Sequence, residues 1–297
     1  MKVKNKIKEK WNILMIIILI VLIIYTLLLF IPLMWGLMTS FKDDFTDFRN
    51  NIFGFPKVWR FDNYPIALFN FYVEVEDGLG GYRNVYMPEQ LLNSIIYSTG
   101  CAFFATFIPC ITGYLTAKFN YKFSKILTVV VIICITLPIV GSLPSQIQIA
   151  KALHLYDSMI GMWIMKANFL SMYLLIFQGM FKAVPNDFIE AAKIDGASNL
   201  KICFNIMLPL VGKTFLTVFL LNFIGFWNDY QTPLIFMPNK PTIAYGLYLF
   251  NRNTDGELST IPMKLTGSMI VMLPILVLFL VFQKRLMGNA LNGGLKG

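Results

Sequence analysis

The sequence predicts an all-α integral membrane protein with six transmembrane helices and both termini in the cytoplasm. Of its 297 residues, 57% are hydrophobic and only 14% are charged, whereas soluble proteins carry about 25% charged residues. The chain contains six apolar segments, and each is long enough to cross a hydrocarbon core, which takes about 20 helical residues. Basic residues concentrate in alternate connections between these segments, which is the pattern that orients membrane helices.

The first element is an N-terminal tail followed by an apolar helix, together residues 1–38. Five lysines stand in the first ten residues, and the apolar run extends from 13 to 37. A secretory signal has an apolar core of only about 7–15 residues and a cleavage site with small side chains. The run is longer and lacks such a site, so we expect an uncleaved transmembrane helix.

An extracytoplasmic loop over residues 39–90 follows the first helix. It is polar and carries most of the acidic residues of the N-terminal third. Its glycine-rich part at 77–81 lacks the preceding strand and the spacing of a phosphate-binding loop. We therefore expect a surface connection there.

Residues 91–285 form the predicted core domain, with five further transmembrane helices. The apolar segments lie at 91–117, 126–150, 159–181, 211–236 and 265–282. Pro138 and Pro144 predict a kink or an early end in the second of these, because proline interrupts helical hydrogen bonding. Lys166, Asn168 and Gln178 make 159–181 the least apolar segment. A cytoplasmic tail is expected over 286–297.

The charge distribution predicts the orientation. The two terminal tails and the connections after the second and fourth apolar segments hold fifteen basic and four acidic residues. The outer connections hold nine basic and eleven acidic residues. Since an excess of Lys and Arg marks the cytoplasmic side, the termini and residues 185–209 are predicted to be inside. The net charge of +9 is therefore a topology signal, and we predict no nucleic-acid partner.

Residues 185–209, between the fourth and fifth apolar segments, are predicted to form two short helices. Pro185 suits a first helical turn, Gly196 can end that helix in a left-handed conformation, and Ser198 can cap the next one. The second helix has one apolar face, made by Leu200, Cys203, Phe204, Met207 and Leu208. Pro209 closes the unit. On these features alone, an ordinary helical hairpin packed between membrane helices is an open alternative.

This segment contains eight residues in a characteristic spacing: Glu190, Ala191, Ala192, Asp195, Gly196, Ala197, Leu208 and Pro209. Their sequence resembles the EAA loop of bacterial ABC-importer permeases. It implies the type I importer permease architecture, in which this loop is a coupling helix that docks in a groove of a cytosolic ATPase subunit. An apolar helix face in a groove is a common mode of recognition.

A second resemblance lies in the tail. Gly293, Gly294, Leu295, Lys296 and Gly297 resemble the glycine-rich tail of maltose-type permeases, which implies contact with the ATPase. The family resemblance implies a permease subunit in the bacterial cytoplasmic membrane, in contact with membrane lipid, that imports a sugar or oligosaccharide by alternating access. Its implied partners are a second homologous permease, an ATPase dimer and an extracellular solute-binding protein. An insertion at 71–88 departs from the family pattern. It either interacts with the binding protein or has no function.

No catalytic, nucleotide-binding or metal-binding motif is found in the sequence. Gly212-Lys213-Thr214 resembles the end of a P-loop, but Met207 stands where the first glycine is required. The four cysteines form no metal-binding pair, and His154, the single histidine, lies in a predicted outer loop. We expect no cofactor in this chain, with ATP and Mg bound by the partner ATPase. The alternatives are an importer of a non-sugar solute, an ion-coupled secondary transporter and a membrane-embedded enzyme.

Candidate solute-path residues lie on the outer half of the fifth apolar segment. Sugar sites combine aromatic surface with placed hydrogen-bonding groups, and this mixture is offered by Asn222, Trp227, Asn228, Asp229 and Tyr230. On a helix, Asn222 and Asp229 share a face, and Trp227 and Tyr230 form a neighbouring one. Lys166, at similar depth, is the expected counter-charge for Asp229, because unpaired charges at membrane depth are costly. Snorkelling of Lys166 to the interface and an interfacial role for Asp229 are the alternatives.

Overall fold

The computed structural model describes residues 13–78, 80–119, 121–137 and 141–292. The predicted N-terminal lysine tail and the predicted ATPase-contacting tail at 293–297 lie outside the described residues. The described chain divides into two compact units, which are treated separately below. Unit 1 comprises residues up to Leu68 together with Asn253–Ile270, and unit 2 comprises Phe69–Arg252 together with the chain from Val271 onward.

Unit 1 contains the first predicted transmembrane helix and the polar loop after it. Its elements are α1 (Ile13–Thr39), a π-helical turn (Asp44–Phe48), most of α2 (Asn63–Asn70), a 3₁₀ turn (Gly256–Ser259) and the start of α14 (Ile261–Asn292). Nearly all side chains of α1 are exposed, which fits a helix that faces lipid. The α1 end is held by the buried Asn63 amide, which donates to the carbonyls of Ser40 (2.8 Å) and Lys42 (3.0 Å).

A buried lysine closes the loop of unit 1. The Lys42 ammonium donates to the carbonyl of Asn51. Burial lowers the pKa of Lys42, and the nearby Asp47 carboxylate opposes that shift. Thr266 on α14 adds a hydrogen bond to the Ser40 carbonyl (3.0 Å). These contacts join the two sequence-distant parts of unit 1.

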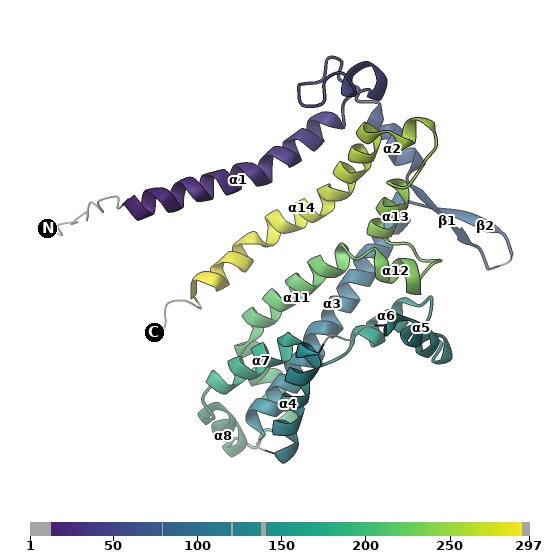
Figure 1. The fold of residues 1–297 in the computed structure, drawn as a ribbon. Coiled ribbons are helices and arrows are strands. Elements are labelled where there is room, and N and C mark those ends of the chain that lie inside the picture. The colour runs from purple at the N-terminus through teal and green to yellow at the C-terminus, as the bar shows by residue number, and fades with distance from the viewer. Residues whose placement is uncertain (1–12, 79, 120, 138–140, 293–297) are drawn as a thin grey trace. The chain divides into compact units, whose positions relative to one another are not determined.

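Unit 2 is built around the long helix α3 (Met87–Lys118), which α7 (Met172–Ala183) and α11 (Gly212–Trp227) pack against (Figure 1). Its other helices are α4 (Lys122–Thr136), α5 (Leu143–Ala152), α6 (Met159–Lys166), α8 (Asp187–Ile194), α9 (Asn199–Ile202), α10 (Leu208–Leu210), α12 (Gln231–Phe236) and α13 (Ile243–Phe250). The main core buries Cys110, Phe177, Phe181 and Met207. A second core gathers around Tyr97 and Met162.

The prediction of six transmembrane helices is only partly confirmed. Three described helices, α1, α3 and α14, are long and apolar enough to cross a membrane, and a fourth crossing is obtained if Asn199–Leu210 and Gly212–Trp227 are counted as one bent span. The predicted kink or early end in 126–150 is observed as an early end, because α4 ends at Thr136 and α5 begins at Leu143 with Pro144 in its first turn.

The other two interruptions lie where the apolar segments carry polar residues. The predicted span 159–181 is divided into α6 and α7, and the break follows Lys166 and includes Asn168. The predicted span 211–236 is divided into α11 and α12, and the break contains Asn228 and Asp229. Side chains of this kind compete with helical backbone hydrogen bonds and favour helix ends.

The predicted all-α class needs a correction, because the insertion at 71–88 contains a β-hairpin. Strand β1 (Tyr72–Glu76) pairs antiparallel with β2 (Tyr82–Tyr86), and Val73 stands opposite Val85. The apolar residues alternate with polar ones in Tyr72-Val73-Glu74-Val75-Glu76, which is the period of a half-buried strand. This signal was present in the sequence, and the glycine-rich turn between the strands lies where a loop was expected.

Candidate functional site

The segment 185–209 forms the two predicted short helices, α8 and α9, which together we call the α8–α9 hairpin. This hairpin is fixed to the end of α3. The ammonium of Lys118, the last residue of α3, donates to the carbonyl of Val184 (2.6 Å) and to the amide oxygen of Asn186 (2.8 Å). Asn186 is the residue that precedes α8. Pro185 lies before this cap and not in the first helical turn, which corrects the predicted start by two residues. Lys118 therefore positions α8 on the core.

The turn between α8 and α9 is a Schellman motif built on Gly196. Gly196 has φ +77°, a conformation that side chains with a branched Cβ tolerate poorly. The Ala197 N–H donates to the carbonyl of Ala192 (2.9 Å) and the Gly196 N–H to that of Lys193 (3.0 Å), which satisfies carbonyls that a helix end leaves open. The predicted left-handed conformation of Gly196 at the helix end is confirmed.

The second half of the hairpin begins at a capped helix and ends in a bend. The Ser198 hydroxyl accepts the N–H of Lys201 (3.3 Å), as predicted. Helix α9 continues through a π-helical turn, Cys203–Met207, into α10, which contains Pro209. The axis then turns by 75° into α11. A π-turn and a proline are both recognised causes of a helix kink, so Pro209 marks the boundary between the hairpin and the membrane helix.

The packing of the hairpin differs from the predicted apolar face. Ala192, Ile202, Cys203 and Met207 are buried in the main core of unit 2. Leu200, which was predicted to share one apolar face with Cys203 and Met207, is instead 72% exposed. The predicted five-residue face is therefore wrong, because the π-turn changes the helical step between Ile202 and Met207.

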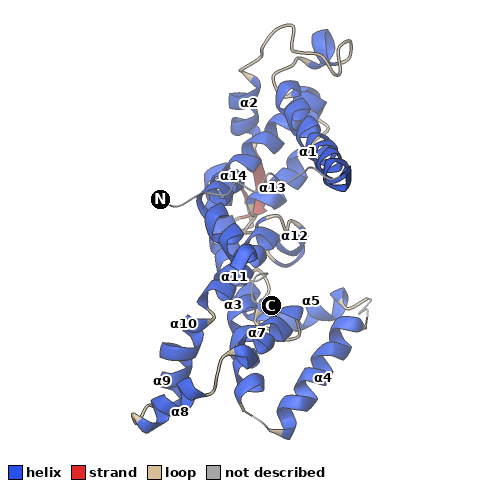
Figure 2. Cartoon of the chain, turned by 90° about the vertical axis from the view of Figure 1, so that its left-hand side faces the viewer, coloured by secondary structure: helices blue, strands red, loops and turns tan. Residues whose placement is uncertain are grey.

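The tip of the hairpin carries exposed apolar side chains. Ile194 is 87% exposed and Leu200 is 72% exposed, one on each side of Gly196. Glu190, Ala191 and Asp195 are also exposed, and Figure 2 shows α8 and α9 lying together at the lower end of the view. The core fixes the hairpin through Ala192, while an apolar tip with polar flanks is left uncovered by the described chain.

The predicted polar residues of α11 contact α3. The Asn222 amide donates to the Thr106 hydroxyl (3.0 Å). The Asp229 carboxylate accepts the hydroxyl of Tyr97 (3.1 Å) and the N–H of Thr232 (3.0 Å). Both residues therefore contact α3, although Asp229 lies beyond the end of α11 at Trp227 and does not share a helical face with Asn222 as predicted. Thr106 and Tyr97 were not among the predicted residues, because nothing in the local sequence of α3 indicates their partners.

The expected ion pair between Lys166 and Asp229 is not formed. The Lys166 ammonium lies over the Phe226 ring, 5.6 Å from its centroid. Phe226 in turn packs edge-on against Tyr97 at 6.1 Å, the residue that binds Asp229. Lys166 therefore contacts one ring of this aromatic pair and Asp229 contacts the other. Lys166 also lines a pocket of about 150 Å³ with Gln146, Gln231 and Thr232.

The predicted neighbouring face of Trp227 and Tyr230 is wrong. Helix α11 ends at Trp227, and Asn228 caps it by donating to the Ile224 carbonyl (2.9 Å). The helical step therefore does not reach Tyr230, whose ring stacks on Tyr248 of α13 at 4.5 Å. Trp227 is buried and stacks on Phe223 at 5.8 Å.

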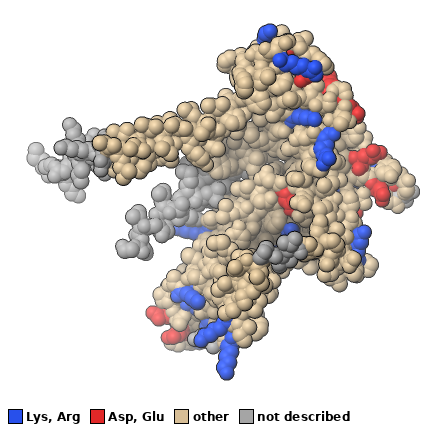
Figure 3. All heavy atoms as spheres, in the orientation of Figure 1, with Lys and Arg blue, Asp and Glu red and all other residues tan. Residues whose placement is uncertain are grey.

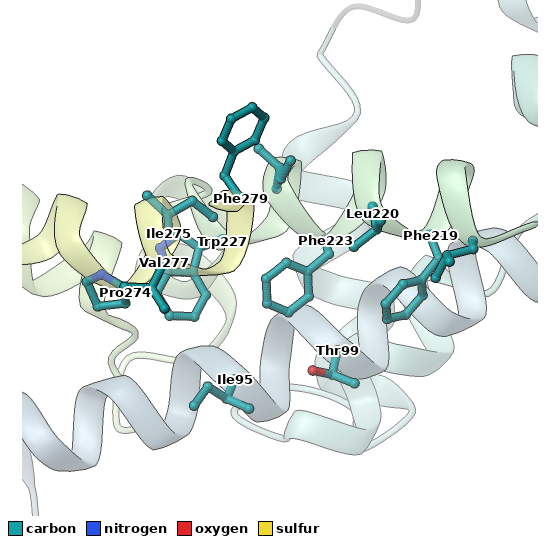
Figure 4. A pocket seen from close by; sticks show the side chains of 12 residues that line it. Ile95, Thr99, Phe219, Leu220, Phe223, Trp227, Pro274, Ile275, Val277 and Phe279 are labelled. Carbon is teal, nitrogen blue, oxygen red and sulfur yellow. The ribbon is translucent and has the colours of Figure 1, made fainter. Parts of the chain in front are cut away.

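Trp227 and Phe223 line an apolar cavity of about 610 Å³ between α3, α11 and α14 (Figure 4). Phe219 also belongs to α11, while Thr99 comes from α3 and Pro274 from α14. Asn222 and Asp229 do not line this cavity. The aromatic and polar residues predicted to form one mixed surface are therefore divided between two environments.

The two predicted sites lie at opposite ends of α11. The hairpin precedes Gly212, and Asp229 follows Trp227, so the helix between them spans about 24 Å at 1.5 Å per residue. Among the described residues, no group of three or more His, Cys, Asp or Glu side chains is arranged to hold a metal ion. The arrangement joins an exposed helical hairpin to a polar site at the far end of the same helix.

Comparison with known proteins gives consistent matches. Residues 110–288 match the family of binding-protein-dependent transport system inner membrane components. The chain is 28% identical to the multiple sugar-binding transport system permease of Streptococcus mutans, and the match covers 100% of each chain. It is 29% identical to the arabinooligosaccharide transport system permease of Bacillus subtilis, over 82% of this chain and 81% of the relative.

Two further matches extend this similarity. The chain is 25% identical to the diacetylchitobiose uptake system permease of Streptomyces coelicolor, over 90% of this chain and 84% of that protein. In fold, it is similar to a bacterial ABC transporter involved in the import of the acidic polysaccharide alginate. That match has a TM-score of 0.72 with 20% sequence identity and covers 91% of this chain and 95% of the other.

Proposed function

We propose that this chain, which belongs to the family of binding-protein-dependent transport system inner membrane components, is the permease subunit of an ATP-driven importer for a sugar or oligosaccharide. The matched region covers most of the chain, and the relatives described above are named as permeases for oligosaccharides or multiple sugars. The observation that carries the proposal is the α8–α9 hairpin, which presents an uncovered apolar tip on a rigidly held base.

The hairpin is the proposed docking element for the ATPase. Ile194 and Leu200 would fill a groove of the partner, and Glu190 would meet a basic residue at its rim. Because Lys118 and Ala192 fix the hairpin to α3 and the core, a movement of the docked ATPase would be transmitted to the membrane helices as a rigid-body movement. Residues 293–297 are proposed to add a second contact with the ATPase. ATP and Mg would be bound by that partner, and this chain would perform no catalysis.

The proposed topology has six crossings with both termini in the cytoplasm. Besides α1, α3 and α14, the pairs α4–α5, α6–α7 and α11–α12 would each cross the membrane as an interrupted span. The excess of basic residues in the tails and in the connections that include 185–209 supports this orientation. Irregular backbone at membrane depth is tolerated where protein or a water-filled cavity surrounds it.

The polar contacts of Asp229, Asn222 and Lys166 are proposed to border the solute path. Ionisable side chains in membrane helices usually face a bundle interior or an aqueous pathway. The path would be completed by a second, homologous permease, and an extracellular binding protein would deliver the solute. Alternating access would then expose the path first to the outside and then to the cytoplasm.

Uptake by the assembled importer in proteoliposomes tests this function. We expect ATP-dependent uptake of at least one oligosaccharide, and only when the ATPase and the binding protein are present. Uptake of amino acids or peptides instead would indicate a non-sugar importer. Uptake driven by an ion gradient without the ATPase would contradict the proposal and indicate a secondary transporter.

A further inference from the structure

The β1–β2 hairpin is held firmly on its inner face. Val73, Val75 and Val85 are buried together with Tyr245 of α13. The Gln90 amide of α3 donates to the Val85 carbonyl (2.8 Å). Apolar packing and a buried hydrogen bond therefore hold the inner side of the sheet against two helices of unit 2.

A polar network holds the hairpin from a second direction. The Asn239 amide oxygen accepts the N–H of Glu76 (3.2 Å), while its nitrogen donates to the Asp157 carboxylate (3.1 Å). The Lys240 ammonium donates to the Asp157 carbonyl (2.9 Å). Asp157 has φ +54°, an uncommon conformation for a non-glycine residue. Asn239, which follows α12, therefore joins the β1–β2 hairpin to the connection before α6.

The outer face of the hairpin is not covered by the described chain. The strand register places Tyr72 opposite Tyr86, Glu74 opposite Asn84 and Glu76 opposite Tyr82. All six side chains are exposed, and Tyr82 is 69% exposed. We call these six residues the tyrosine face. Tyrosine is enriched in protein interfaces, because it offers a large contact area with few rotatable bonds and keeps a polar hydroxyl.

The tyrosine face is acidic. Glu74 and Glu76 form no ion pair within the described chain. The guanidinium of Arg83, on the inner face, is bound by both oxygens of Glu89 at 2.8 and 2.9 Å. Arg83 therefore does not neutralise the negative charges of Glu74 and Glu76. Figure 3 shows acidic side chains gathered over the hairpin at the right edge of the view.

We infer that the tyrosine face docks the importer's solute-binding protein, through a basic patch on that protein. This inference rests on the proposed function, which places the hairpin outside the membrane. A rigid surface binds without the ordering cost of a flexible loop, and two uncompensated carboxylates attract Lys and Arg of a partner. The bilayer is a poorer match, because anionic headgroups repel carboxylates.

Titration of the binding protein tests the inference. The importer is reconstituted in nanodiscs, and ATP hydrolysis is measured against the concentration of solute-loaded binding protein, the same protein that supports uptake by the wild-type importer. The double variant Glu74→Lys/Glu76→Lys should raise the half-maximal concentration by about tenfold at about 50 mM salt, with a smaller difference at about 0.5 M salt. Maximal and basal hydrolysis should stay unchanged. The matched control is Asp255→Lys, an exposed acidic residue outside the hairpin.

Tyr82→Ala provides an independent arm, since it removes contact area without changing charge. We expect it to raise the half-maximal concentration by about fivefold or more. Unchanged half-maximal concentrations in both hairpin variants, with normal stimulation of the wild-type importer, would overturn the inference while leaving the proposed function intact. A wild-type importer that no binding protein stimulates would instead contradict the proposed function.

Discussion

The α8–α9 hairpin and the Asp229 site are joined by one helix, yet they are encoded in different ways. In the hairpin, the turn and the second cap are set by residues within five positions of each other, such as Ala197 with Ala192 and Ser198 with Lys201. At the other end, Asn222 contacts a residue 116 positions away, and Asp229 contacts one 132 positions away. Because its contacts are local, the geometry of the hairpin can be predicted from the sequence. The contacts of the Asp229 site are long-range and cannot be predicted in this way.

The difference also bears on function. The hairpin leaves its apolar tip exposed, and so it has a surface to offer to another subunit. The Asp229 site uses its polar groups within the chain, and Lys166 also lines a small pocket. Variants at the hairpin should therefore affect assembly, and variants at the Asp229 site should affect transport in an assembled complex.

The largest effect is expected from Gly196→Val. Valine at φ +77° costs roughly 1–2 kcal/mol and displaces α9 relative to α8, so copurification with the ATPase and transport should both fall by more than about tenfold. Gly196→Asn is the matched control, because asparagine tolerates this conformation. Normal copurification of the valine variant would show that the turn geometry is not needed for docking.

The next effect is expected at the exposed tip. Ile194→Asp combined with Leu200→Asp should weaken ATPase binding by about tenfold, because two charges would replace apolar contacts in a groove. The membrane insertion of the permease should stay unchanged, since both side chains are exposed. Asn205→Asp is the control, because it adds a charge at an exposed position of the same hairpin outside the tip and the motif. Pull-down of the ATPase with tagged permease measures the result, and equal recovery from the tip variant and wild type would exclude the tip as the dock.

Asp229→Ala should lower transport while leaving assembly unaltered. The substitution leaves the buried Tyr97 hydroxyl and the Thr232 N–H without their acceptor. Each buried group without a hydrogen bond destabilises the local structure by about 1–3 kcal/mol of free energy. Asp255→Ala is the matched control, because it removes an exposed carboxylate outside this site, and it should transport nearly normally. Uptake at saturating solute, normalised to recovered complex, separates the two. Wild-type uptake in Asp229→Ala would remove this residue from the path.

The smallest effect concerns the coupling between Lys166 and Asp229. Because Lys166 contacts Phe226 and Asp229 contacts Tyr97 rather than each other, a double-mutant cycle with Lys166→Ala and Asp229→Ala should give a coupling below about 0.5 kcal/mol. Transport rates provide the readout, with complex recovery as the control. A coupling well above 1 kcal/mol would indicate that the ion pair forms in another state of the transport cycle.

The features that the sequence determined by itself are those with a local physical cause. Apolar length indicated the membrane helices, basic residues indicated an orientation that still awaits a test, and Gly196 and Ser198 marked the turn and cap of the hairpin. The strand alternation at Tyr72–Glu76 was equally local, and it was missed only because the loop was treated as irregular.

Tertiary structure decided the rest, because contacts between distant segments cannot be derived from spacing along one helix. It placed Tyr97 and Thr106 opposite the polar residues of α11, ended that helix at Trp227 and thereby separated Tyr230 from it. It also determined which apolar residues of the hairpin are buried and which are exposed, since a π-turn shifts the helical face. A buried polar group must find a partner wherever the fold supplies one, and the fold supplied both partners from α3, more than one hundred residues away in the sequence.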